Sequence, residues 1–354
     1  MNVLNKSTSV RLVALDSKAL RCIWMRLGRR SLSLLSEWRA DLSSRGPLSR
    51  EQLHQYWHDG YVITEGLLDP QRLLDPVIEE VDHSVDVLAR QLLKEGKIRN
   101  AHEDKGFLRR LSFLEQEFSG ASVILHTQGI LTEGIATLWS SRELLSVARQ
   151  ILGNDQEISG HPVWNLRCKT PRNALATVPF HQDTAYLGEG SERTHQLTAW
   201  VPLVDAYREM GCLQVIRGGH LSGEVLPHHL EKSRADRDSG SWYLYIQEED
   251  LPEGEVVTCE VKKGDVLWLN NLIPHASTEN YSDKIRWSLD LRWQRSNDMT
   301  GFEHTKAALP MVSPKDPLFK FDWKSWSSAK TTKREIGDKV NVSGPWLDRW
   351  RTHP

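Results

Sequence analysis

A short segment near the middle of the chain places a histidine and an aspartate two residues apart. It reads Pro179-Phe180-His181-Gln182-Asp183. On an extended strand alternate side chains project from one face, so the imidazole of His181 and the carboxylate of Asp183 could bind one metal ion. Pairs of this kind also occur by chance on protein surfaces, and the segment alone is a weak indication of a metal site.

A second segment supplies a third possible ligand. A turn at Gly264-Asp265 leads into the apolar run 266–270, and His275 follows the end of that predicted strand. Two histidines and one carboxylate on one face of an ion leave adjacent positions open, an arrangement typical of non-heme Fe(II) oxygenases. A hydrolytic or structural zinc site could use the same three residues.

Arg286 begins another predicted strand, eleven residues after His275. An arginine there can form two parallel hydrogen bonds to a carboxylate. A dicarboxylate co-substrate bound to iron would need such a group at its remote end. A zinc site would leave Arg286 unexplained, so the arginine favours the oxygenase interpretation.

Helical patterns precede strand patterns along the chain. A helix is expected from Ser49 to about Gly60, then a strand at 61–64, then a long helix that starts at Pro70. Short apolar runs between turn residues predict strands at 157–169, 196–203, 211–216, 242–247, 256–261, 265–270 and 286–293. Many short strands with Gly- and Pro-rich turns are typical of a sandwich or barrel, so we expect an α+β fold with N-terminal helices bracing a β core.

The composition divides the chain into three parts. Residues 1–47 are basic, Ser-rich and poor in acids, which is typical of a mitochondrial transit peptide. The alternative is a basic N-terminal extension without a targeting function. The main domain is expected at 48–296, with a long charged stretch at 224–255 of the kind that forms lids or binding loops. The aromatic-rich tail, 297–354, is expected to be irregular and to pack on the core.

Overall charge and apolar content exclude several classes. A net charge of -2 gives no basis for binding nucleic acid, and no apolar run is long enough to span a membrane. The four cysteines form no CxxC pair, as expected of free thiols in a reducing compartment. We therefore expect a cytoplasmic protein, or one of the mitochondrial matrix if 1–47 is a targeting segment; nothing indicates the oligomeric state.

From about Leu48 to Gln294 the sequence resembles the phytanoyl-CoA dioxygenase family, which includes phytanoyl-CoA hydroxylase and ectoine hydroxylase. The matching motifs are His181-Gln182-Asp183, 197–203 with Asp205, Gly211-Cys212-Leu213, Gly218-Gly219-His220, Gly264-Asp265, and His275 with Asn280 and Arg286. They agree in order and spacing over about two thirds of the chain. The resemblance implies a double-stranded β-helix, the jelly roll of the cupin type.

The resemblance implies roles for individual residues. His181, Asp183 and His275 match the family's iron ligands, and Arg286 matches the residue that holds the distal carboxylate of 2-oxoglutarate. Ser277 matches a position that supports the same carboxylate.

Three further residues are candidates for cofactor binding. Lys169 is similar to a family lysine near the co-substrate, although the loop after it is variable. Asn165 and Arg167 lie on the strand before it, and the jelly roll points alternate side chains inward, so both could line the cavity. The pair His228-His229 lies in a charged stretch and is expected to be solvated.

The resemblance implies an Fe(II)- and 2-oxoglutarate-dependent dioxygenase that uses O₂ to hydroxylate, or desaturate, an unactivated C–H bond. Related halogenases have a small residue where this chain has Asp183, so the carboxylate argues against halogenation. A non-catalytic, cupin-like metal- or ligand-binding protein is the alternative. The substrate could be an acyl-CoA bound by basic residues such as Arg172, Lys232, Arg234 and Arg237, or an amino-acid-derived or natural-product molecule.

Overall fold

The structure is a computed structural model, and it describes residues 44–127, 131–173, 176–230, 243–303, 307–316, 318–324 and 350. The predicted targeting segment therefore lies almost wholly outside the described residues, as do Lys232, Arg234 and Arg237. Within the described ranges, no helix has both the length and the apolar content needed to cross a membrane.

The first helix begins and ends as predicted. In α3 (Arg50–Asp59) the Ser49 hydroxyl accepts a hydrogen bond from the Gln52 backbone, and the Gln52 side chain accepts one from the Ser49 backbone. This reciprocal capping box satisfies two N–H groups that a helix start leaves unpaired. The helix ends at Gly60, whose φ of 86° suits glycine, and β1 (Tyr61–Thr64) follows directly.

The remaining N-terminal helices form a layer beside the large sheet. The long predicted helix begins with a π-helical turn at Pro70–Leu74, capped by the Asp69 side chain, and continues as α4 (Asp75–Lys94). Its predicted apolar stripe is buried: Leu73, Leu74, Val77, Val81, Val85 and Leu88. A 3-10 turn (Glu103–Lys105) and four shorter helices follow: α5 (Arg110–Glu117), α6 (Ala121–Thr127), α7 (Glu133–Trp139) and α8 (Arg142–Leu152).

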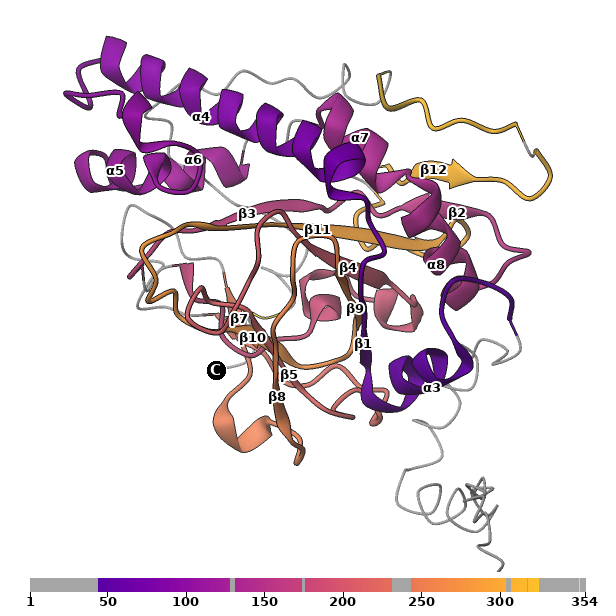
Figure 1. Cartoon of the computed structure of the whole chain (residues 1–354). Coiled ribbons are helices and arrows are strands. Elements are labelled where there is room, and N and C mark those ends of the chain that lie inside the picture. The colour runs from indigo at the N-terminus through magenta and orange to yellow at the C-terminus, as the bar shows by residue number, and fades with distance from the viewer. Residues whose placement is uncertain are drawn as a thin grey trace, which may run out of the picture.

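The strands form antiparallel sheets on two levels. The large sheet has the order β1-β9-β4-β11-β2-β12, with β3 also paired to β11, and the small sheet has the order β10-β5-β8. Helices α4 to α7 lie on one side of the large sheet, and the small sheet lies on the other (Figure 1). The strand bounds are β2 Ile158–Gly160, β3 Asn165–Lys169, β4 Leu197–Pro202, β5 Leu213–Ile216, β8 Val256–Cys259, β9 Val266–Asn270, β10 His275–Ser277, β11 Arg286–Arg295 and β12 Leu309–Val312.

Strand β11 separates an apolar face from a polar one. Alternate residues Trp287, Leu289, Leu291 and Trp293 are fully buried in the apolar core that the helices share. The residues between them are polar and face the space between the two sheets: Arg286, Ser288, Asp290 and Arg292. The period of two along a strand therefore places the core on one side of β11 and a charged site on the other.

Three expectations about strands are wrong in detail. The predicted strand 157–169 is two strands, because Pro162 has no N–H with which to continue the ladder. The tail is not wholly irregular, since β12 pairs with β2 at the edge of the large sheet, where Pro310 is tolerated. The stretch 224–255 contains the short pair β6 (His229–Leu230) and β7 (Leu244–Tyr245) and a 3-10 turn (Glu248–Asp250), so the expected strand 242–247 is only two residues long.

Truncation of Leu291 tests the apolar face of β11. Leu291→Ala removes buried methyl groups from a packed core and should lower the free energy of unfolding by about 2–5 kcal/mol in urea denaturation. Val87, which is 49% exposed on α4, provides the control: Val87→Ala should change stability by less than about 0.5 kcal/mol. Equal losses for the two variants would contradict this packing.

Candidate metal centre and adjoining cavities

His181 and His275 are joined through their backbones. Each N–H donates to the other residue's carbonyl, at 3.0 and 2.9 Å, in an isolated antiparallel bridge beside the small sheet. The expected extended strand stops at Gln182, and Asp183 is the first residue of a 3-10 turn, Asp183–Tyr186. The two ligand candidates in this segment are therefore brought together by the start of a turn rather than by one continuous strand.

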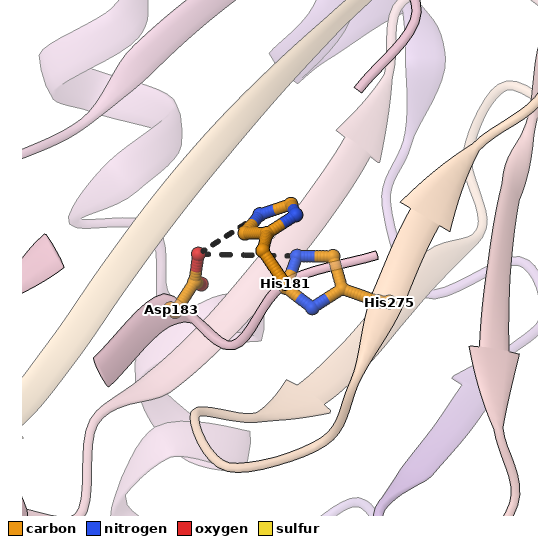
Figure 2. A group of neighbouring side chains, drawn as sticks. All are labelled: His181, Asp183 and His275. Carbon is orange, nitrogen blue, oxygen red and sulfur yellow. Dashed lines mark ion pairs between the residues drawn. The ribbon is translucent and has the colours of Figure 1, made fainter. Parts of the chain in front are cut away.

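The three predicted ligands converge on one point between the sheets. His181 Nε2 lies 4.0 Å and His275 Nε2 lies 3.8 Å from the same Oδ1 atom of Asp183. Figure 2 shows both imidazoles turned toward this carboxylate. All three side chains are buried, and their potential ligand atoms lie within 4.8 Å of one another, close enough to bind one ion.

Backbone carbonyls orient both imidazoles. The Nδ1 atom of His181 lies 2.8 Å from the Pro179 carbonyl, and that of His275 lies 3.0 Å from the Ile273 carbonyl. A carbonyl can only accept a hydrogen bond, so each Nδ1 carries the proton and each Nε2 keeps a free lone pair. Burial and the neighbouring imidazole of His275 lower the pKa of His181 well below its ordinary value, which keeps it in the neutral form that binds metals.

Asp183 is held by a buried arginine and a hydroxyl. Arg292 donates to both carboxylate oxygens at 3.1 Å, and Thr198 Oγ1 donates to Oδ2 at 2.9 Å. Burial acts to raise the pKa of Asp183, but the charge of Arg292, with the two imidazoles, holds that pKa well below its usual range. The aspartate is therefore ionised and held in one orientation, as a metal ligand would need to be.

The sequence analysis missed Arg292, Asp290 and Thr198. Arg292 also lies 3.7 Å from Asp290, so the site contains a buried chain of charges rather than an isolated triad. The alternation Arg286-x-Ser288-x-Asp290-x-Arg292 within an apolar strand was the signal that could have found two of them. Thr198 has no comparable signal, because one threonine in a strand is ordinary.

The other predicted co-substrate residues meet at one end of the triad. Lys169 donates to Ser277 Oγ at 2.8 Å and also to the Thr278 carbonyl. Arg286 donates to Ser288 Oγ at 2.5 Å, while its buried Nε has no partner among the described residues. Ser277 and Arg286 line a small cavity of about 40 Å³ together with the three ligand candidates; we call it the inner cavity.

The electrostatics of this end are unusual because two basic side chains, Lys169 and Arg286, are buried close together. Burial and then the charge of Arg286 lower the pKa of Lys169 to about 6. Burial also lowers the pKa of Arg286 to about 10, which leaves it charged at neutral pH. A bound anion at this place would offset the cost of burying a positive charge on Lys169 and on Arg286.

Asn165 and Arg167 line a second cavity, which adjoins the first at His181 and Asp183. This outer cavity has a volume of about 120 Å³, and its wall includes His161, Val163 and Phe302 as well as His181 and Asp183. Arg167 lines both cavities and is paired with Asp290, at 2.8 Å. The two cavities thus share His181 and Asp183, whereas His275 lines the inner cavity alone.

The prediction for His228 is wrong. Its side chain is buried, and its Nε2 accepts a hydrogen bond from the Gln182 backbone at 3.0 Å. His228 therefore supports the segment between the two ligands His181 and Asp183. Arg172 is exposed, at a loop position with a φ of 53°, and does not line either cavity.

Curated relatives share about a quarter of their residues with this chain. A 1-deoxypentalenic acid 11-beta-hydroxylase from Streptomyces exfoliatus is 26% identical over 267 residues, which cover 72% of this chain and 84% of that protein. Phytanoyl-CoA dioxygenase domain-containing protein 1 from Bos taurus is 25% identical over 264 residues, covering 68% and 87%.

Solved structures give weaker likenesses. EctD from S. alaskensis, crystallised with 2-oxoglutarate and 5-hydroxyectoine, has a TM-score of 0.47 and 18% identity, covering 78% of this chain and 84% of that one. The alpha-ketoglutarate-dependent epimerase SnoN from nogalamycin biosynthesis has a TM-score of 0.44 and 20% identity, covering 76% and 92%.

The sequence model of the phytanoyl-CoA dioxygenase (PhyH) family matches residues 56–288, about two thirds of the chain. This interval contains the three ligand candidates and, at the start of β11, Arg286. The chain belongs to the phytanoyl-CoA dioxygenase family.

Proposed function

We propose that this protein uses Fe(II), 2-oxoglutarate and O₂ to hydroxylate, or desaturate, an unactivated C–H bond of a small organic molecule. One observation carries the proposal. Three buried metal-ligating side chains and the buried Arg286 line one cavity, and the buried Lys169 donates a hydrogen bond to Ser277 in the wall of that cavity. A metal-binding protein without catalytic function would need the three metal-ligating residues but not the two basic ones.

The donor set fits Fe(II). His181 and His275 present free Nε2 lone pairs, and Asp183 is ionised and fixed in orientation. Two neutral imidazoles and one carboxylate are the ligands that non-heme iron oxygenases use, and they leave positions for a co-substrate and O₂. These three residues would hold the iron.

The buried basic side chains fit the remote carboxylate of 2-oxoglutarate. Arg286 Nε has no partner among the described residues, and a bound anion would stabilise the protonated form of Lys169, while Ser277 can share a hydrogen bond with the anion. We assign Arg286 as the main anchor, with Lys169 and Ser277 as supporting donors. Trp200, whose ring centroid lies 5.3 Å from the Arg286 guanidinium, fixes the position of that side chain.

Iron with bound 2-oxoglutarate supplies an oxidant for C–H bonds and releases succinate and CO₂. The protein's own residues bind and orient these groups and exclude water. Asp183 occupies the ligand position that a halide would need, so we assign hydroxylation or desaturation rather than halogenation.

We also propose that the two facing sheets form a double-stranded β-helix. The antiparallel small sheet packs over the inner face of the large one through buried residues such as Trp200, Val215 and Leu267. Residues 48–296 would be the oxygenase domain, to which the tail adds the edge strand β12.

The substrate is proposed to be a small molecule that enters the outer cavity. Relatives named for acting on 1-deoxypentalenic acid, and neighbours crystallised with 5-hydroxyectoine or nogalamycin-related ligands, support this class.

The metal and co-substrate assignment can be tested by anaerobic titration. Wild-type protein with Fe(II) and 2-oxoglutarate should develop a visible charge-transfer band and, on exposure to O₂, release succinate. His181→Ala and Asp183→Ala should lose both signals, because each removes a ligand. Wild-type protein with no band and no succinate above these variants would refute the oxygenase function.

Substitution of Arg286 separates co-substrate binding from metal binding. Arg286→Gln should weaken 2-oxoglutarate binding at least about thirtyfold, since removing one partner of a buried charged pair costs about 2–5 kcal/mol. Iron affinity should change little, and Arg217→Gln, at a half-exposed site, is the matched control. Equal loss of iron and 2-oxoglutarate would contradict the role assigned to Arg286.

The pH dependence of 2-oxoglutarate binding tests Lys169. With a pKa of about 6 in the free site, Lys169 must take up a proton to pair with the anion at higher pH. The dissociation constant, measured on iron-saturated protein, should therefore rise between about pH 6 and pH 8, by at most tenfold per unit. The Lys169→Met variant should bind 2-oxoglutarate more weakly at pH 6 and show a smaller rise of the dissociation constant with pH. The control variant Lys97→Met should show the same rise as the wild type. A wild-type dissociation constant that does not change with pH would contradict the role of Lys169 in binding the anion.

A further inference from the structure

Four basic side chains of the paired strands β3 and β11 face the space between the two sheets, and three of them have a defined task. All three guanidinium nitrogens of Arg292 donate hydrogen bonds, two to the Asp183 carboxylate and one to the Val163 carbonyl. Arg286 lines the inner cavity, and Lys169 donates a hydrogen bond to Ser277 in the wall of that cavity. The fourth, Arg167, lies at the boundary of the two cavities.

Arg167 is only partly satisfied by the protein. Its Nε donates to Asp290 Oδ2 at 2.8 Å, and the same oxygen also lies 3.7 Å from Arg292. Among the described residues, no acceptor is bonded to either terminal nitrogen of Arg167, and its side chain is 24% exposed. One face of this guanidinium is therefore open to the cavity.

A charge count of the site leaves one positive charge over. Arg167, Arg286 and Arg292 face Asp183 and Asp290. The charge of Fe(II) is cancelled by the two negative charges of 2-oxoglutarate, and a protonated Lys169 would add to the excess. Burying an uncompensated charge is costly, so a further anion should bind here.

The outer cavity offers no protein anion for that role. Asp183 is the sole acid among the described residues that line the outer cavity, and its carboxylate is already paired with Arg292. His161 is neutral, because burial lowers its pKa to about 4. Apolar groups of Val163, Leu187 and Phe302 form much of the remaining wall.

We propose that the substrate is a small carboxylic acid whose carboxylate is bound by the terminal nitrogens of Arg167. The apolar body of the acid then lies against Val163, Leu187 and Phe302, in the cavity that also contains His181 and Asp183. This inference rests on the proposed function and makes Arg167 a determinant of substrate specificity instead of a co-substrate ligand. An uncharged amide of the same shape leaves the guanidinium unpaired and binds poorly.

Matched pairs of probes test the proposal by calorimetry. Cyclohexanecarboxylate and benzoate are compared with cyclohexanecarboxamide and benzamide on the full-length protein saturated with Zn(II) and 2-oxoglutarate. Each acid should bind at least about tenfold more tightly than its amide. Arg167→Gln should abolish this preference, and Arg217→Gln should retain it.

Two further variants protect the test against misfolding. Arg167→Gln combined with Asp290→Asn removes both members of the ion pair and should also bind acids and amides equally. Arg167→Lys keeps the charge and should retain a reduced preference for acids. Equal binding of acid and amide by the wild type, failure of every acid to bind, or a preference that survives Arg167→Gln overturns the proposal.

Separate titrations, with metal and 2-oxoglutarate alone and with the acids alone, distinguish failure of the proposed function from failure of the anion site at Arg167. If 2-oxoglutarate and metal fail to bind but acids still bind through Arg167, the proposed function fails and the anion site stands. If metal and co-substrate bind normally but acids show no dependence on Arg167, only the anion site fails.

Discussion

The buried pairing of Asp183 with Arg292 is the interaction on which the site depends. A carboxylate between two sheets is stable as an anion only with a permanent cation beside it, and Arg292 donates to both of its oxygens. Arg292 can reach that place because β11 alternates polar and apolar residues along ten positions. The same alternation directs Trp287, Leu289 and Trp293 into the helical side of the core.

The layers of the fold enclose the polar face of β11. The helices bury one face of the large sheet, and the small sheet covers the other, so the charged face of β11 is enclosed without being filled. Two adjoining cavities remain, and His181 and Asp183 line both. A co-substrate in one cavity and a substrate in the other could then reach one metal ion.

Much of this could be predicted from the sequence. Residue type and spacing predicted His181, Asp183 and His275 as metal ligands, and the structure brings these three side chains close enough to bind one ion. The capping of α3 and the apolar stripe of α4 were also predictable, since local hydrogen bonds and helical periodicity determine them. Membership of the family follows from motifs spread over two thirds of the chain.

Other features depend on contacts distant in sequence. The burial of His228 results from packing against Gln182, which no local pattern indicates. The position of β12 depends on pairing with β2, more than a hundred residues earlier. The partners of Asp183 come from β4 and β11, and only the register of these strands, with Thr198 opposite Arg292, brings them together.

A crystal structure of the protein grown anaerobically with Fe(II) and 2-oxoglutarate tests the central claim most directly. We predict one iron bound by His181, Asp183 and His275, with the remote carboxylate of 2-oxoglutarate on Arg286 in the inner cavity. Iron bound elsewhere, or 2-oxoglutarate bound away from Arg286, would contradict this account of the site.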